Sequence, residues 1–178
     1  MELVPASRFT VHQLTDAYNQ TRVDYLIPMP MTPPRLQEYI TAYDLRLDAS
    51  AVAVEGDQIL GLCMLGLRQG RGWITRLGVL PTTRRHGVGL ALMEYCIAQA
   101  AQHGAVMLYL EVIVGNTPAH TLFLRLGFRE VRRLLVLRRP PGILPKTRCA
   151  SRQPALGGLP GQTRWSRWPT SAMWNPCI

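Results

Sequence analysis

The stretch that most constrains the fold is an apolar strand that runs through a short basic turn into a helix, over residues 77–92. The turn holds three basic residues and two glycines: Arg84, Arg85, His86, Gly87 and Gly89. A glycine has no Cβ, so the backbone can come close to a ligand there. The first N–H groups of a helix have no partner within it and lie at its positive end. The stretch therefore predicts a cradle for a phosphate group, to which the arginines add cationic side chains.

Two named phosphate-binding motifs do not fit this turn. It has no Gly-Lys-Ser/Thr after a Gly-x-x-x-x frame and no Gly-x-Gly-x-x-Gly series. A P-loop and a standard dinucleotide fingerprint are therefore not expected. Glycines before a helix also serve simply to make the turn, so the series Arg84-x-x-Gly87-x-Gly89 alone leaves a purely structural role open.

The residues after the turn predict a helix and a parallel strand. Leu90 to His103 carries apolar residues at helical spacing and stops at Gly104. Val106 to Val112 is a nearly continuous apolar run, typical of a strand buried on both faces. A strand, a helix and a strand in this order predict a right-handed parallel crossover.

The residues before the turn predict a short first strand, two helices and an antiparallel meander. Met1 to Pro5 fits a strand, and Thr10-Val11-His12-Gln13 fits a capping box that starts a helix. Thr32 followed by Pro33 fits the start of a second helix. Three apolar runs separated by glycine turns predict the meander: Ala51–Val54, Ile59–Leu67 and Gly72–Leu80.

A second motif follows the crossover: Leu110-Glu111-Val112-x-x-x-Asn116-x-x-Ala119-x-x-Leu122-Phe123-x-x-x-Gly127-Phe128. Together with Arg84-x-x-Gly87-x-Gly89 it resembles the GCN5-related N-acetyltransferase (GNAT) superfamily, and is most similar to bacterial protein N-terminal acetyltransferases. The resemblance implies an α/β (α+β) fold in which a mixed twisted sheet of about six to seven strands is flanked by about four helices. The strands before and after the Leu90–His103 helix are expected to splay apart. We assign residues 1–139 to this domain.

The resemblance implies acetyl-CoA as co-substrate, with its pyrophosphate in the turn and its pantetheine arm against the backbone near Leu77 and Val79. We assign cofactor binding to this strand end, the turn and the last helix: Leu77, Gly78, Val79, Arg84, Arg85, His86, Gly87, Val88, Gly89, Leu90, Asn116 and Phe123. No metal is expected, because the cysteines and histidines form no ligand cluster in the sequence.

Acetyl transfer to an amine needs a base for the ammonium proton. Glu111 is a lone carboxylate in an apolar run, where burial would raise its pKa, and the matching glutamate is the base in the family that it resembles. The alternative is a carboxylate paired with Arg76 or another arginine. Many relatives carry a tyrosine at the position of Phe123 as general acid, so the acid here is open between water, His120, Tyr109 and an unprotonated thiolate. A non-catalytic acyl-CoA-binding module is the alternative function.

The acceptor is expected to enter beside the loop that follows the first helix. This loop carries Asp24, Tyr25 and Met29, which we assign to acceptor binding, with Asp24 as the candidate partner of an ammonium group. Its apolar content favours a peptide N-terminus or a small amine with apolar parts over an aminoglycoside. The alternative is a loop that simply packs on the core.

The charge of the chain is concentrated in its last part. Residues 1–127 hold ten basic and ten acidic residues, whereas residues 128–178 hold ten basic residues and only Glu130. The net charge of +9 therefore says little about the domain, and nucleic acid is not expected as a partner. Residues 140–178 are expected to form a mostly irregular basic tail. The longest apolar run is too short to cross a bilayer, so we expect a cytoplasmic protein with free cysteines, as a monomer or a homodimer.

Overall fold

The computed structural model describes residues 1–135, and the predicted tail lies outside them. These residues contain a sheet whose strands follow the chain order: β1 (Glu2–Pro5), β2 (Ala51–Glu55), β3 (Gln58–Arg68), β4 (Arg71–Val79) and β5 (Met107–Tyr109). The first four strands pair antiparallel, and β5 pairs parallel to β4. This arrangement confirms the predicted meander and the predicted crossover.

The first two helices begin at the residues that local chemistry predicted, and the helix expected over Leu90–His103 covers Val88–Gln102. The helices are α1 (Val11–Gln20), α2 (Pro33–Ala42), α3 (Val88–Gln102) and α4 (Thr117–Arg125), with short 3-10 turns η1 (Ala6–Arg8) and η2 (Pro81–Thr83). Thr10 forms the expected capping box with Gln13, and Pro33 follows the N-cap Thr32. Gly104, with φ of 72°, allows the chain to turn away after α3.

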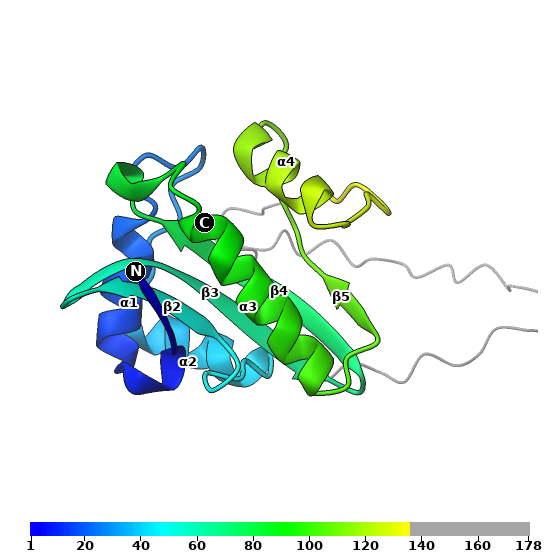
Figure 1. The fold of residues 1–178 in the computed structure, drawn as a ribbon, viewed down its shortest axis with the longest axis horizontal. Helices are drawn as coiled ribbons and strands as arrows, with labels where there is room; N and C mark the ends of the chain where they lie inside the picture. Colours follow the sequence, from blue (N-terminus) through cyan, green and yellow to red (C-terminus); the bar gives the residue numbers. More distant parts are fainter. Residues whose placement is uncertain (136–178) are drawn as a thin grey trace, which may run out of the picture. The chain divides into compact units, whose positions relative to one another are not determined.

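The sheet is buried on both faces by helices, with α3 across one face and α1 and α2 across the other (Figure 1). Alternation along β3 explains this layering, since successive side chains point to opposite faces. Cys63 and Leu65 pack in the cluster that contains α3, whereas Leu62 and Met64 pack in the cluster that contains α1 and α2. Leu92, Met93 and Cys96 of α3 are fully buried, which confirms the predicted amphipathic helix.

Two predictions about the end of the sheet are wrong. The expected strand Val106–Val112 is reduced to Met107–Tyr109, and it is not buried, because Val106 is 88% exposed and Met107 is 52% exposed. Among residues 1–135 the sheet has five strands, fewer than the six to seven expected. In the described part of the chain β5 has only β4 as a neighbouring strand; Met107 and Tyr109 are exposed, whereas Leu108 is half-buried against the core.

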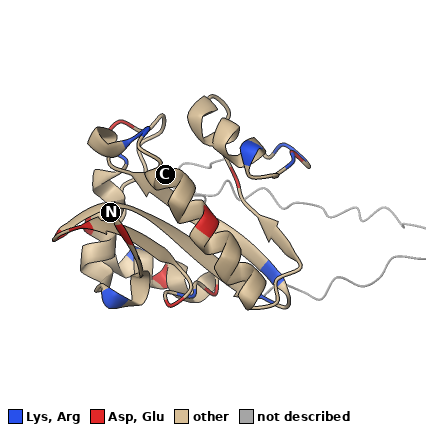
Figure 2. Cartoon of the chain, in the orientation of Figure 1, with Lys and Arg blue, Asp and Glu red and all other residues tan. Residues whose placement is uncertain are grey.

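Charged side chains of both signs are interspersed over the described elements, in agreement with the even balance of residues 1–127 (Figure 2). Within residues 1–135, no helix has the length and apolar character needed to cross a membrane.

Candidate active site

The turn between β4 and α3 presents backbone N–H groups at the start of a long helix. Gly87 is the N-cap of α3 with φ of 82°, and it supplies no side-chain cap. The hydrogen bond from the Ala91 N–H group to the Gly87 carbonyl is the first turn of the helix, so the three preceding N–H groups have no partner within α3. These groups belong to Val88, Gly89 and Leu90. Together with the positive end of the helix they can bind an anion.

Arg85 and His86 lie exposed in the same turn. Arg85 has a left-handed backbone with φ of 68°, and within residues 1–135 its side chain has no hydrogen-bond or ion-pair partner. The Val88 side chain, in contrast, is buried in the core that contains α3. The turn thus offers backbone donors and the Arg85 guanidinium to a ligand, while Val88 anchors the start of the helix.

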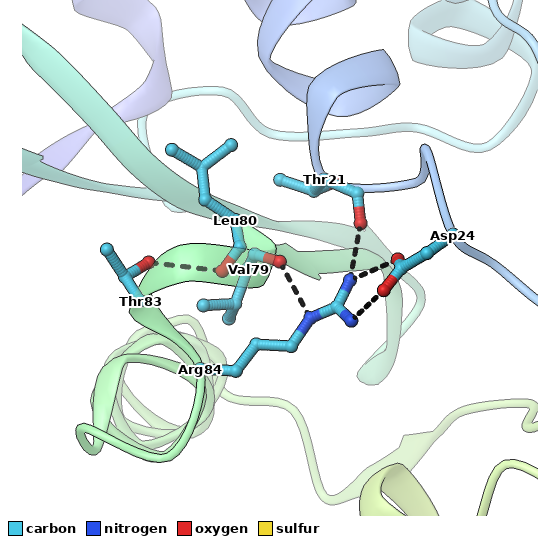
Figure 3. Close-up of polar contacts among 6 residues, drawn as sticks. All are labelled: Thr21, Asp24, Val79, Leu80, Thr83 and Arg84. Carbon is cyan, nitrogen blue, oxygen red and sulfur yellow. Dashed lines mark hydrogen bonds and ion pairs between the residues drawn. The ribbon is translucent and has the colours of Figure 1, made fainter.

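Arg84 is bound to the loop that follows α1 (Figure 3). Its Nη1 and Nη2 atoms donate to the two carboxylate oxygens of Asp24, at 2.6 and 2.7 Å. Nη2 also donates to the Thr21 carbonyl at 3.2 Å, and Nε donates to the Val79 carbonyl at 3.2 Å. The hydrogen bond from Arg84 lowers the pKa of the Asp24 carboxyl below its ordinary value. The structure thus brings together a predicted cofactor residue and a predicted acceptor residue, which contact each other.

Strands β4 and β5 separate next to this turn. Among the described residues, β5 pairs with β4 only from Arg71 to Trp73, so the edge of β4 from Ile74 to Val79 has no strand beside it. A bulge near this edge lets Arg76 and Leu77 oppose the single residue Cys63 on β3. Arg76 has φ of 56° at this bulge. The expected splaying of the strands is therefore present at the end of the sheet that carries the turn.

The Thr21–Tyr25 segment lies against the end of β4. The Arg22 Nη2 atom donates to the Leu77 carbonyl at 3.1 Å, and its guanidinium carbon lies 4.1 Å from the centre of the Tyr25 ring. Thr21 packs so closely on Gly78 that a Cβ atom at Gly78 would lie 2.2 Å from the Thr21 hydroxyl oxygen. Gly78, predicted as a cofactor residue, is thus required by the packing of this segment.

Asn116 connects α4 to the same segment. Its side chain accepts a hydrogen bond from the Ala119 N–H group at 3.4 Å and donates to the Tyr25 hydroxyl at 3.4 Å. Asn116, predicted as a cofactor residue, is therefore the N-cap of α4. Met29 is half-buried in the same loop, in which Leu26 and Ile27 are exposed.

Glu111 and Phe123 differ in burial. Glu111 is exposed in the segment between β5 and α4, so the prediction that burial surrounds it is wrong. The physical reason is the short β5, beyond which the described chain leaves the sheet. Phe123 is 7% exposed and packs edge-to-face on Phe128, with ring centres 6.2 Å apart.

Sequence reasoning missed Thr21 and Arg22. The signal for Arg22 was an arginine with tyrosines three and four positions away, Tyr25 and Tyr18, which lets one guanidinium lie near both rings. Thr21 has no comparable signal, since its role depends on Gly78, far away in the sequence. No three His, Cys, Asp or Glu residues among the described part of the chain gather into a possible metal site.

Comparisons with known proteins agree with this arrangement. Residues 13–128 match the sequence profile of the Acetyltransferase (GNAT) family. An N-alpha-acetyltransferase of Sulfurisphaera tokodaii is 40% identical over 63 residues, which cover 35% of this chain and 38% of that protein. The chain therefore matches well under half the length of this curated relative.

Solved structures share the fold. The ribosomal-protein-S18-alanine N-acetyltransferase of Escherichia coli superposes with a TM-score of 0.59 at 18% identity, covering 74% of this chain and 79% of that one. A chain of the NatC complex, solved with a Gag peptide and CoA, superposes with a TM-score of 0.58 at 22% identity, covering 75% of this chain and 89% of that one.

Proposed function

The chain belongs to the GNAT acetyltransferase family, and on that premise we propose that it moves the acetyl group of acetyl-CoA to the amine of a peptide N-terminus or a small molecule. One observation carries the proposal. Within residues 1–135, the edge of β4 that has no strand beside it ends at a turn where three N–H groups have no partner within the helix α3. An extended pantetheine arm can pair with a strand edge, and a pyrophosphate suits a helix N-terminus.

We assign the pyrophosphate to the N–H groups of Val88, Gly89 and Leu90, with Arg85 and His86 beside it. The pantetheine arm is assigned to the backbone of Leu77 and Val79. Their carbonyls already accept hydrogen bonds from Arg22 and Arg84, so the arm would have to use the N–H groups or displace these arginines.

The chemistry is a direct transfer. The neutral amine nitrogen attacks the thioester carbonyl, a C–N bond forms, the C–S bond breaks, and coenzyme A leaves as a thiolate. Before the attack Glu111 takes one proton from the ammonium group, directly or through water, and after the C–N bond forms the nitrogen gives up its second proton to water. Phe123 has no proton to give, so the thiolate takes one from water, His120 or Tyr109, or leaves without one. Glu111 is exposed, so the proton can pass to it through water as well as directly.

The acceptor is assigned to the loop after α1. Leu26 is 58% exposed and Ile27 is 41% exposed, beside Tyr25 and Met29. Burial of such apolar side chains on binding is favourable, so this loop suits an acceptor with apolar parts. Two of the similar structures, one named as a ribosomal-protein-S18-alanine N-acetyltransferase and one solved with a Gag peptide, also support a peptide amine.

A second candidate is an acyl-CoA-binding module that does not catalyse. The observation in its favour is Phe123, which is buried and lacks the phenol of a general acid. A measurement of thiol release from acetyl-CoA distinguishes the two functions, with peptides, small amines and aminoglycosides as acceptors. Release with an apolar peptide is expected for the enzyme. Binding of acetyl-CoA without release from any acceptor would favour the module.

The role of Glu111 has its own test. Glu111→Gln keeps the size of the side chain and removes its basicity, so we expect turnover to fall by about 100-fold or more with little change in acetyl-CoA affinity. Glu94→Gln, an exposed glutamate on α3, is the matched control. Equal turnover of Glu111→Gln and the control would contradict the assignment.

A further inference from the structure

Most hydrogen-bond donors of the Arg84 side chain are used by contacts within the protein. A guanidinium has five N–H donors, and four of those in Arg84 are used by Asp24, Thr21 and Val79. Two of these bonds form the parallel fork that arginine makes with a carboxylate. A phosphate oxygen could bind only the remaining donor unless the fork opened. Arg85, its neighbour, has no such contacts in the described chain and lies exposed.

The contacts of Arg84 converge on one segment. Thr21 and Asp24 both lie in the Thr21–Tyr25 segment, whose other contacts are Arg22 with the Leu77 carbonyl and Tyr25 with Asn116. The segment is thus fixed to β4, to the turn and to α4 at once. The residues that follow it, Leu26 and Ile27, are the exposed apolar side chains of the loop.

We propose that Arg84 and Asp24 are positioning residues that act as one unit. Their ion pair fixes the Thr21–Tyr25 segment beside the open edge of β4, and so sets the place of the acceptor relative to the acetyl group. Arg84 does not hold the phosphate, and Asp24 does not hold the ammonium group of the acceptor. The effect on acceptor position rests on the proposed acetyl transfer, whereas the effect of the ion pair on the Thr21–Tyr25 segment does not.

Measurements can distinguish this inference from the alternative, in which Arg84 and Asp24 have independent binding roles. If Arg84 held the phosphate and Asp24 the amine, Arg84→Gln would weaken only acetyl-CoA, Asp24→Asn would weaken only the acceptor, and their effects would add. If the two residues form one unit, either substitution breaks the same pair. Both substitutions should then change the same measured quantity, and the double variant should change it no more than either single variant does.

The test is a double-mutant cycle on the full chain, read by hydrogen exchange. We expect peptides that cover residues 21–25 to exchange faster by roughly 2- to 10-fold in Asp24→Asn and in Arg84→Gln, with no further increase in the double variant. Arg84→Lys keeps the charge but cannot form the fork, so it should match Arg84→Gln. The melting temperature should barely change, because exposed ion pairs contribute little to global stability.

Arg46 and Asp48 provide the matched control. They form another exposed fork, with Nε to Oδ1 at 3.0 Å and Nη2 to Oδ2 at 2.7 Å, far from the turn in sequence. Arg46→Gln should leave exchange at residues 21–25 unchanged. Unchanged exchange in Asp24→Asn and Arg84→Gln, or additive effects of the two, would overturn the inference.

Kinetics separate this inference from the proposed function. With an accepted amine, both single variants should raise the acceptor KM by roughly 2- to 10-fold and leave the KM for acetyl-CoA within twofold. A rise in the acetyl-CoA KM of Arg84→Gln alone would show a phosphate ligand and overturn the inference. If the effects of the two substitutions on hydrogen exchange do not add but no acceptor is acetylated, the proposed function fails while the ion pair retains its positioning role.

Discussion

Arg85 adopts a left-handed backbone conformation, with φ of 68°, in the turn before α3. This conformation costs a residue with a Cβ atom roughly 1–2 kcal/mol. Strain of this kind persists where the surrounding structure enforces it, and it is concentrated at functional sites. Arg85 combines this strain with an exposed guanidinium beside the free N–H groups of α3.

Replacing Arg85 by Gly and by Ala separates the strain from the charge. Arg85→Gly should raise the free energy of unfolding by roughly 1 kcal/mol relative to Arg85→Ala, because Gly adopts positive φ freely. Both should weaken acetyl-CoA binding equally, since both remove the cation. Urea unfolding and calorimetric titration measure the two effects. Equal stability of the two variants would show that the turn is not strained.

The burial of Glu111 could not be predicted from the residues next to it in the sequence. The letters around it, Met107 to Val112, are almost all apolar, and such a run usually indicates a buried strand. Burial, however, depends on what covers the strand, and among the described residues β5 is covered on one edge for only three residues. The sequence therefore identified a lone carboxylate in an apolar run, but its environment depended on distant partners.

At the scale of elements, α1 is joined to β4 through one close contact. Gly78→Ala would place a methyl group 2.2 Å from the Thr21 hydroxyl oxygen. We expect this overpacking to lower the free energy of unfolding by about 1–3 kcal/mol. Gly89→Ala is the control, because its Cβ would meet its nearest side chains at 3.5 and 3.6 Å. Equal urea midpoints for the two variants would mean that Thr21 moves away without cost.

The contact between β3 and α3 includes two buried thiols. The Cys96 thiol donates to the Cys63 carbonyl at 3.7 Å. The neighbouring Cys96 thiol and burial raise the pKa of the Cys63 thiol well above its ordinary value of 9.0. The folded protein therefore keeps this thiol protonated where the unfolded chain would ionise it. The contribution of this protonated thiol to the free energy of unfolding is therefore complete below pH 9.0 and is lost as the pH rises above that value.

The measurement is the free energy of unfolding from pH 8 to pH 10, compared with that of Cys63→Ala. The wild-type protein should lose more stability above pH 9.0 than the variant, with a difference in slope of at most about 1.4 kcal/mol per pH unit. In peptide mapping at pH 8, neither Cys63 nor Cys96 of the folded protein should react with iodoacetamide. Identical pH slopes, or rapid labelling, would contradict this description of the core.

Local chemistry explains which elements were predictable. The capping box at Thr10, the Thr32-Pro33 start of α2 and the glycine after α3 depend on neighbours within a few residues, and all three are present. The ion pair between Asp24 and Arg84 joins residues that are 60 positions apart. Its existence depends on how α1 packs on the sheet, which no local pattern indicates.

At the scale of the whole molecule, a ligand that binds only the folded state stabilises it. Acetyl-CoA at 100 times its dissociation constant should add roughly 2.7 kcal/mol to the free energy of unfolding. A thermal melt should therefore shift clearly upward with acetyl-CoA and not with NADH or ATP, which carry phosphates but no pantetheine arm. An equal shift with ATP would mean that the turn binds phosphates without selecting coenzyme A.

The most direct test of the proposed activity follows the acetyl group itself. The protein is incubated with acetyl-CoA labelled with ¹³C in the acetyl group and with a short peptide that has an apolar N-terminal region, and the peptide is sequenced by mass spectrometry. We predict one labelled acetyl group on the α-amine, formed by the wild-type protein and by Glu94→Gln and nearly absent with Glu111→Gln. Bound acetyl-CoA with no labelled product from any peptide or small amine would contradict an acetyltransferase.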